Sequence, residues 1–577
     1  MVPGALAMIV ANAAVLLASH ALLDRVRTGK PSTDLTLFLL LRLLLVSAAV
    51  LAAGMLHLLT PLGLGIAGAA VLALLIARGA HRRLPRWSPG SWGPLWIAFA
   101  AVLGLRLLLQ VWFFAPSFED SLAYHLPKIA EWVRAGAFTG EHGLDVRATF
   151  PAGFELVETW WVVFLHHDVL IEMAGVEFLL LGGAALHALA SGLGWSTRAA
   201  RVSTAFFVLG PALYFQATSC VNDGAVAALI VAASALIVAQ APPLLVLLPV
   251  AFGAGVKPTF LYALPGLVVL AALIPSRGDD PLARRGGTLA AIAGAALLVG
   301  AWWYLRNWIV FGNPIHPMGP RGMKSMVTGS TIQRVGPSLR SLEENLNCFF
   351  DLRIYDNARP PDALGTATVS WGASAFALGS TALVPLLRAD ALLRRVALAL
   401  TFSALCVFAL VELDLWDMRF VMFFTALPAL ALGRLWERHR FVRVLGVVAM
   451  ALQFAGTFVP GNLSGELLPR MARQGWRDRA STPLLPDAPS GQAAYLCDDF
   501  GGSYPLYGPS YSRSVVYLRD GNADALLSHL DRDRIAVIYV AGSLKRSIGM
   551  LEEGVRRGRL KPFDRDGWKG YFVLPPG

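Results

Sequence analysis

Long apolar stretches repeat through the first 460 residues of this 577-residue chain. Each is about as long as the 17–25 residues that a helix needs to cross the hydrocarbon core of a bilayer. The chain has 56% hydrophobic and only 15% charged residues, whereas soluble proteins carry about 25% charged residues. Because the apolar runs are continuous rather than alternating, they exclude a membrane β-barrel. The sequence therefore predicts an all-α polytopic membrane protein.

The hydropathy pattern predicts roughly fourteen spans, with boundaries good to a few residues. The stretch 223–256 is the least regular, because Ala241-Pro242-Pro243 interrupts it, and a re-entrant segment is an alternative there. The predicted spans are 2–22, 36–58, 61–78, 93–114, 168–191, 202–220, 223–240, 243–256, 259–275, 287–310, 369–388, 393–412, 419–433 and 441–459.

The basic residues gather in short segments between the predicted spans. A net charge of +11 would suggest a nucleic-acid partner for a soluble protein, but here it fits the excess of Lys and Arg in cytoplasmic loops. No nucleic-acid partner is therefore expected. Placing the clusters in the cytoplasm puts both termini outside, with three long segments at 115–167, 311–368 and 460–577. The clusters are Arg25–Lys30, Arg78–Arg86, Arg198–Arg201, Arg277–Arg285, Arg388–Arg395 and Arg434–Arg443.

The first outer segment is expected to contain two juxtamembrane helices. Pro127 is suited to open the first, since proline is favoured at the first helical position. That helix has an amphipathic pattern, with Lys128 on its polar face and Trp132 on its apolar face, which is typical of a helix lying on a membrane surface. A second helix is expected around 153–166.

The last outer segment is expected to be a small extracytoplasmic α/β domain, because strand-like and helix-like runs alternate in it. The strand-like runs are Ala493–Cys497, Val515–Leu518, Ile535–Val540 and Tyr571–Leu574, and the helix-like runs are Ala523–Leu530 and Leu544–Arg556.

An acidic pair, Glu119-Asp120, follows the predicted span 93–114. One carboxylate is suited to accept a proton from an acceptor hydroxyl or amine while the other orients it or binds a metal. The alternative is an ordinary pair of solvated loop carboxylates. Tyr124, His125 and Lys128 lie close by in the sequence and favour the functional interpretation.

Three cations stand at the predicted outer ends of spans, namely Arg306, Arg419 and Lys257. Arginine can grip a phosphate with two hydrogen bonds, and a lone lysine near apolar runs usually faces a cavity or a partner. Together they predict a site for a lipid phosphate or pyrophosphate. For Arg306 the alternative is a side chain that reaches up to the lipid headgroups. Asp223 stands at another such junction, where the alternative is a helix cap.

These motifs resemble those of the GT-C superfamily of integral-membrane glycosyltransferases, which use polyprenyl-phosphate-linked sugars. The similarity is to the branch of the protein mannosyltransferases, aminoarabinose transferases and rhizobial lipopolysaccharide-core transferases, and it covers about 93–435. The matching residues are Glu119 to Pro127 with Trp132 and Gly136, Asn222-Asp223, Gly255 to Thr259, Tyr304 to Asn307 with Gly312-Asn313-Pro314, and Arg419-Phe420 with Pro428.

The resemblance implies a GT-C-like helical bundle over 93–460, preceded by extra transmembrane helices in 1–92 and followed by the α/β domain in 461–577. It implies that Asp120 is the catalytic base, with Glu119 beside it. It further implies that Arg306, Arg419 and Lys257 hold the donor phosphate. The full predicted substrate-binding set adds Tyr124, His125, Lys128, Asn222, Asp223 and Asn307.

The sequence therefore predicts an inverting glycosyltransferase of the bacterial inner membrane. It would move a sugar from a polyprenyl-phosphate donor to an envelope acceptor, which is a lipid, a polysaccharide or a protein. No metal site and no cofactor are expected, although a divalent cation at Glu119 is an alternative. The rival functions are a transporter or lipid flippase and a non-catalytic protein of envelope polysaccharide assembly. Transporters often show internal repeats, and the sequence has none that we detect.

Overall fold

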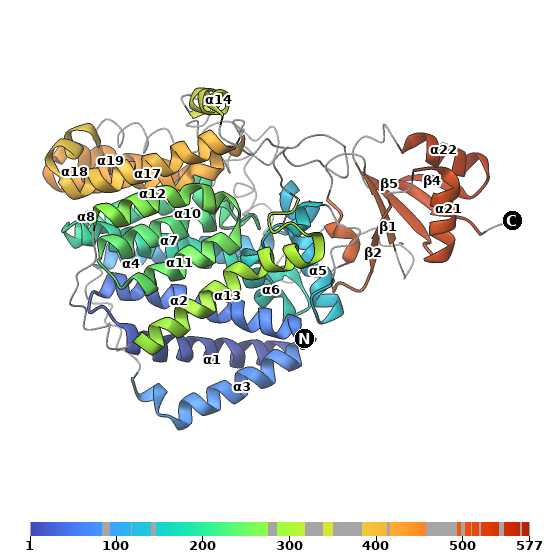
Figure 1. Ribbon diagram of the computed structural model, residues 1–577, viewed down its shortest axis with the longest axis horizontal. Helices are drawn as coiled ribbons and strands as arrows, with labels where there is room; N and C mark the ends of the chain where they lie inside the picture. Colours follow the sequence, from blue (N-terminus) through green and yellow to red (C-terminus); the bar gives the residue numbers. More distant parts are fainter. Residues whose placement is uncertain are drawn as a thin grey trace.

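A bundle of long helices and a small five-stranded sheet make up the computed structural model of the chain (Figure 1). The N-terminus and the sheet lie at the same end of the bundle in this view. The structure describes residues 2–83, 93–116, 118–139, 146–274, 286–317, 338–349, 383–411, 416–456, 493–497, 502–508, 510–518, 521–541, 547–565 and 568–575.

The helices of the bundle follow the apolar runs of the sequence. They are α1 (Val2–Val26), α2 (Pro31–Met55), α3 (Pro61–Ala77), α4 (Pro94–Phe113), α7 (Met173–Gly192), α8 (Thr197–Val208), α9 (Pro211–Gln216), α10 (Asp223–Val238), α11 (Pro243–Val256), α12 (Thr259–Leu273), α13 (Gly286–Phe311), α17 (Ala391–Leu410), α18 (Ala426–Arg438) and α19 (Arg440–Gly456). A short helix, α14 (Leu339–Phe349), packs against α17.

Seven helices among the described residues are long and apolar enough to cross a membrane, and α3, α10, α11 and α12 are shorter apolar helices. The chain is therefore a multi-pass membrane protein, but the predicted number of spans is not confirmed. The predicted span 202–220 is broken into α8 and α9 at Gly210-Pro211, because proline lacks the N–H that a continuous helix needs. The predicted span 369–388 begins outside the described residues. Most of the loop 311–368 also lies outside them.

The first three helices are integral to the bundle. Helix α2 packs against α7 and against α6 (Gly153–Val163). Arg42 on α2 donates to Glu177 on α7 over 2.7 Å, and both side chains are about 10% exposed. A buried pair of this kind is costly to break from one side, so it ties the predicted N-terminal extension to the rest of the chain.

Helices are present at the positions expected for the two juxtamembrane helices, as α5 (Leu126–Ala135) and α6. Proline stands in the first turn of α5, and Gly136 ends the helix with φ +65°, a left-handed conformation that favours glycine. The expected position of Lys128 on the solvated face of α5 is wrong. Its side chain is buried together with Ile129 and Trp132, because it has a partner on α6 that its own helix does not reveal.

The C-terminal domain contains a mixed sheet with the strand order β2-β1-β3-β5-β4. The first three strands of this order run parallel, while β5 pairs antiparallel with β3 and β4. Strand β4 was not predicted, since it contains Pro562 and three charged residues, but an edge strand tolerates proline. The elements are β1 (Ala493–Cys497), β2 (Val515–Tyr517), α21 (Ala523–Arg532), β3 (Val537–Ala541), α22 (Ile548–Arg556), β4 (Leu560–Arg565) and β5 (Trp568–Val573).

Candidate active site

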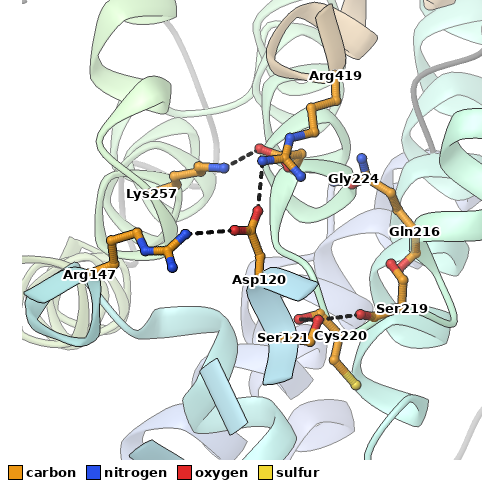
Figure 2. Close-up of polar contacts among 10 residues, drawn as sticks. Asp120, Ser121, Arg147, Gln216, Ser219, Cys220, Gly224, Lys257 and Arg419 are labelled. Carbon is orange, nitrogen blue, oxygen red and sulfur yellow. Dashed lines mark hydrogen bonds and ion pairs between the residues drawn. The ribbon is translucent and has the colours of Figure 1, made fainter. Parts of the chain in front are cut away.

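Asp120 immediately precedes a single π-helical turn, η3 (Ser121–His125), in which the backbone N–H of Leu126 donates to the carbonyl of Ser121. Such turns are rare and are frequent at functional sites. The Ser121 hydroxyl donates to the carbonyl oxygens of Ser219 at 2.5 Å and Cys220 at 2.9 Å. These bonds hold Asp120 beside the turn that leads into α10 (Figure 2).

Two arginines hold the carboxylate of Asp120. Arg147 Nη1 lies 3.0 Å from Oδ1, and Arg419 Nη2 lies 2.8 Å from Oδ2. Arg147 belongs to a 3₁₀ turn, η4 (Val146–Thr149), and Arg419 to another, η8 (Trp416–Thr425). Burial would raise the pKa of Asp120, but the charges of Arg419 and Arg147 outweigh it and lower the pKa to about 2. Asp120 is therefore ionised at neutral pH.

The contacts continue from Arg419 to a second carboxylate. Arg419 Nε lies 3.3 Å from Asp223 Oδ2, and Lys257 donates to the other oxygen of Asp223. The five residues Arg147, Asp120, Arg419, Asp223 and Lys257 form what we call the ion-pair chain. It contains three cations and two carboxylates, so one positive charge is left to attract an anion.

Asp223 does not cap α10 as the alternative interpretation supposed. Asn222 occupies the cap position and makes no side-chain capping bond. Its amide instead donates to the carbonyl of Val256 over 3.3 Å, which joins the start of α10 to the end of α11 just before Lys257. Asn222 therefore orders the backbone beneath the ion-pair chain.

Arg306 and Asn307 stand near the end of α13. The half-buried guanidinium of Arg306 donates to the side-chain oxygen of Asn307 over 3.0 Å and lies 5.5 Å from the ring centre of Phe311. The buried amide of Asn307 donates to the carbonyl of Thr149 over 2.9 Å. This bond connects the end of α13 to η4 and so to the backbone that carries Arg147.

His125 and Lys128 point to α6 rather than to Asp120. His125 Nδ1 lies 3.0 Å from Glu155 Oε1, and Lys128 Nζ lies 2.9 Å from the same oxygen. All three side chains are buried. Burial would raise the pKa of Glu155, but the charges of Lys128 and His125 outweigh it and lower the pKa to about 2. This trio is the physical reason why Lys128 is not solvated.

The fold matches a crystal structure of ArnT from Cupriavidus metallidurans bound to undecaprenyl phosphate. The TM-score is 0.52 at 13% identity, over 84% of this chain and 99% of ArnT. ArnT in the apo state matches with a TM-score of 0.51 at 13% identity, over 84% of this chain and 98% of that chain. The chain has the GT-C fold. No family model matches the sequence, and no curated protein does.

Within this GT-C fold the structure brings together four of the predicted site residues, Asp120, Asp223, Lys257 and Arg419. Tyr124 is adjacent, with its ring centre 4.6 Å from the guanidinium carbon of Arg147. Glu119 is exposed. Within the described ranges no group of three or more His, Cys, Asp or Glu side chains could hold a metal ion.

Two residues of this site were not predicted. Arg147 is a single basic residue in an irregular segment, 27 positions after Asp120, and no pattern in the sequence marks it. Glu155 did leave a signal, because it is one of two carboxylates, with Glu158, in a helix whose other residues are mostly apolar. A carboxylate buried in such a helix needs a cation, and Lys128 is the cation that reaches Glu155.

Proposed function

We propose that this protein is a glycosyltransferase of the bacterial inner membrane. It takes a sugar from a polyprenyl-phosphate donor at the outer face and passes it to an envelope acceptor. The observation that carries the proposal is the ion-pair chain, in which a partly buried, ionised carboxylate lies among three cations. The similar fold of ArnT, whose crystal structure holds undecaprenyl phosphate, supports a lipid phosphate as the anion.

In the proposed reaction Asp120 accepts the proton of the acceptor nucleophile as that nucleophile attacks the anomeric carbon. The bond between this carbon and the phosphate oxygen breaks, and polyprenyl phosphate leaves as an anion. Arg419 and Lys257 stabilise the negative charge that develops on the leaving oxygen. Arg306 offers a further cation at the end of α13. Attack from the face opposite the leaving group inverts the anomeric centre.

The arrangement also gives the donor a way to activate the base. In the free protein each oxygen of Asp120 has a guanidinium partner, and such a carboxylate is a weak base. A donor phosphate competes for Arg419, since guanidinium binds phosphate as readily as carboxylate. Losing that partner raises the pKa of Asp120 and frees one oxygen for the acceptor. The donor therefore binds before proton transfer becomes favourable.

The test is transfer from a radiolabelled polyprenyl-phosphate-sugar pool in membranes, with release of free polyprenyl phosphate as the second readout. Asp120→Asn at matched expression should lower turnover by roughly 10²–10⁴-fold. Asp531→Asn, which changes an exposed carboxylate of the C-terminal domain, is the control and should retain it. Retained turnover in Asp120→Asn would refute the base. No release of polyprenyl phosphate by the unmodified protein would favour the transporter or the assembly protein.

A further inference from the structure

The two faces of the C-terminal sheet contact different parts of the protein. Ala494 and Ile538 belong to a core cluster with α21 and α22. Their neighbours Tyr495 and Tyr539 belong instead to the main core cluster that includes the bundle. The strand register aligns Tyr517 of β2, Tyr495 of β1 and Tyr539 of β3 in one row. The sheet thus presents a row of tyrosines to the bundle.

Tyr517, at one end of this row, reaches the candidate active site. It packs against a buried cluster formed by Ala123, Tyr124 and Ala148. The first two residues belong to η3, which follows Asp120, and Ala148 is the neighbour of Arg147 in η4. The C-terminal domain therefore packs against a cluster that both segments holding the base and its arginine form.

The contacts continue from Tyr124 to the carboxylate. The guanidinium carbon of Arg147 lies 4.6 Å from the ring centre of Tyr124, while its Nη1 lies 3.0 Å from Asp120. A ring in that position attracts and orients a guanidinium. Tyr517, the cluster that contains Tyr124, Arg147 and Asp120 therefore form a continuous series of contacts from the sheet to the base.

Two further contacts show that the domain is closely docked. A Cβ atom at Gly502 would lie 2.5 Å from the Cβ of Leu122 in η3, so only glycine allows this approach. The hydroxyl of Tyr504, in the buried turn η9 (Tyr504–Tyr507), donates to Asp168 over 3.1 Å. Asp168 belongs to the bundle side, in the turn before α7. The docking surface thus includes the π-helical turn itself.

We propose that Tyr517 is a positioning residue for Asp120, acting through Tyr124 and Arg147, and that the docked C-terminal domain completes the active site. This inference rests on the proposed function. The charged and titratable groups near Asp120 are Arg419 from η8, Arg147 from η4, and Tyr124 and His125 from η3, the last with its ring directed at Glu155. Of these, Arg147 is the one whose orientation depends on the ring against which Tyr517 packs.

The experiment compares Tyr517→Ala, Tyr517→Phe and Tyr571→Ala. Tyr571 lies on the opposite face of the same sheet, packed with the α21 and α22 cluster, and controls for the stability of the domain. Tyr517→Ala should lower kcat by about 10- to 100-fold, the scale of a small misplacement of a reacting group, with KM for the donor within about twofold. The acid limb of its pH profile should move to higher pH. Tyr517→Phe retains the ring and should retain activity, as should Tyr571→Ala.

Hydrogen exchange of residues 118–126 provides a readout that needs no turnover. Tyr517→Ala and Gly502→Val should both accelerate exchange there, and Tyr571→Ala should not. Unchanged exchange and kcat in Tyr517→Ala would overturn the inference, as would equal losses of activity in Tyr517→Ala and Tyr571→Ala. If the unmodified protein transfers no sugar, the proposed function fails, while the exchange data still decide whether Tyr517 orders the turn.

Discussion

Asp120 shows how the residues around a carboxylate decide what it can do. The carboxylate is buried enough that burial alone would make it a stronger base, yet Arg419 and Arg147 keep its pKa at about 2. Removing one arginine therefore changes the pKa of Asp120 without replacing Asp120 itself. Arg147 is the better target, because Arg419 also pairs with Asp223.

Replacing Arg147 with alanine should raise the pKa of Asp120 by about 1 unit or more, the usual effect of losing a close opposite charge. The base works only when it is deprotonated. The acid limb of kcat/KM, which reports the free enzyme, should therefore move to higher pH by the same amount. Arg134→Ala provides the control, because Arg134 is an exposed arginine of the same outer segment that pairs with Glu131. A pH profile of Arg147→Ala that coincides with this control would contradict the assignment.

Four of the five residues of the ion-pair chain were predictable for one reason. Asp120, Asp223, Lys257 and Arg419 each stand where an apolar run ends, and a charge at a helix end is visible in a sequence. Arg147 has no such position, and its role comes from a contact across 27 residues. The pairing among the four was equally hidden, since elements far apart in the chain bring them together.

At the scale of elements, the packing of α5 on α6 depends on one buried carboxylate. Glu155 Oε1 lies within 3.0 Å of both Lys128 Nζ and His125 Nδ1, and all three side chains are buried. Glu155→Ala should lower the free energy of unfolding by about 3–5 kcal/mol, since it leaves a buried ammonium without its partner. Thermal unfolding in detergent measures this loss. The double variant Lys128→Met, Glu155→Leu should recover most of it, and a double variant as unstable as the single one would show that charge is not the cause.

The trio of Glu155, Lys128 and His125 also makes the free energy of unfolding depend on pH. The pKa of Glu155 in the folded protein, about 2, is lower than the unfolded value of about 4.3. Its contribution is therefore complete above about pH 4.3 and is lost as the pH falls toward 2. Melting curves between these values should show a steeper loss of stability for the unmodified protein than for the double variant. Parallel curves would contradict the assignment.

Elements were predictable where their own pattern determines them. The apolar runs and the prolines at helix starts predicted most helices, and the strand-like runs of the C-terminal segment predicted four of the five strands. The failures have tertiary causes. Lys128 looked solvated because its partner lies on another helix, and β4 looked irregular because its partner β5, not its own residues, makes it a strand.

For the whole molecule, the arrangement of the helices separates the end of the bundle that carries the active site from the end where basic residues gather. The N-terminus and the C-terminal sheet share one end (Figure 1), and the sheet contacts η3 beside Asp120 there. The described basic clusters at the junctions of α1 with α2, of α7 with α8 and of α18 with α19 lie where helices that run away from that end finish. The positive-inside rule predicts that these clusters are cytoplasmic and therefore that the active site faces outward.

Thiol labelling tests this orientation. In a chain whose four cysteines are replaced, a single cysteine at Gly521 probes the C-terminal domain and one at His439 probes the junction of α18 and α19, both at exposed positions. An impermeant maleimide should label Gly521→Cys in intact spheroplasts, and His439→Cys only after lysis. The reverse pattern would place Asp120 in the cytoplasm, where a donor presented at the outer face could not reach it. Labelling both variants after lysis controls for reactivity, because it shows that each thiol is accessible once the membrane barrier is removed.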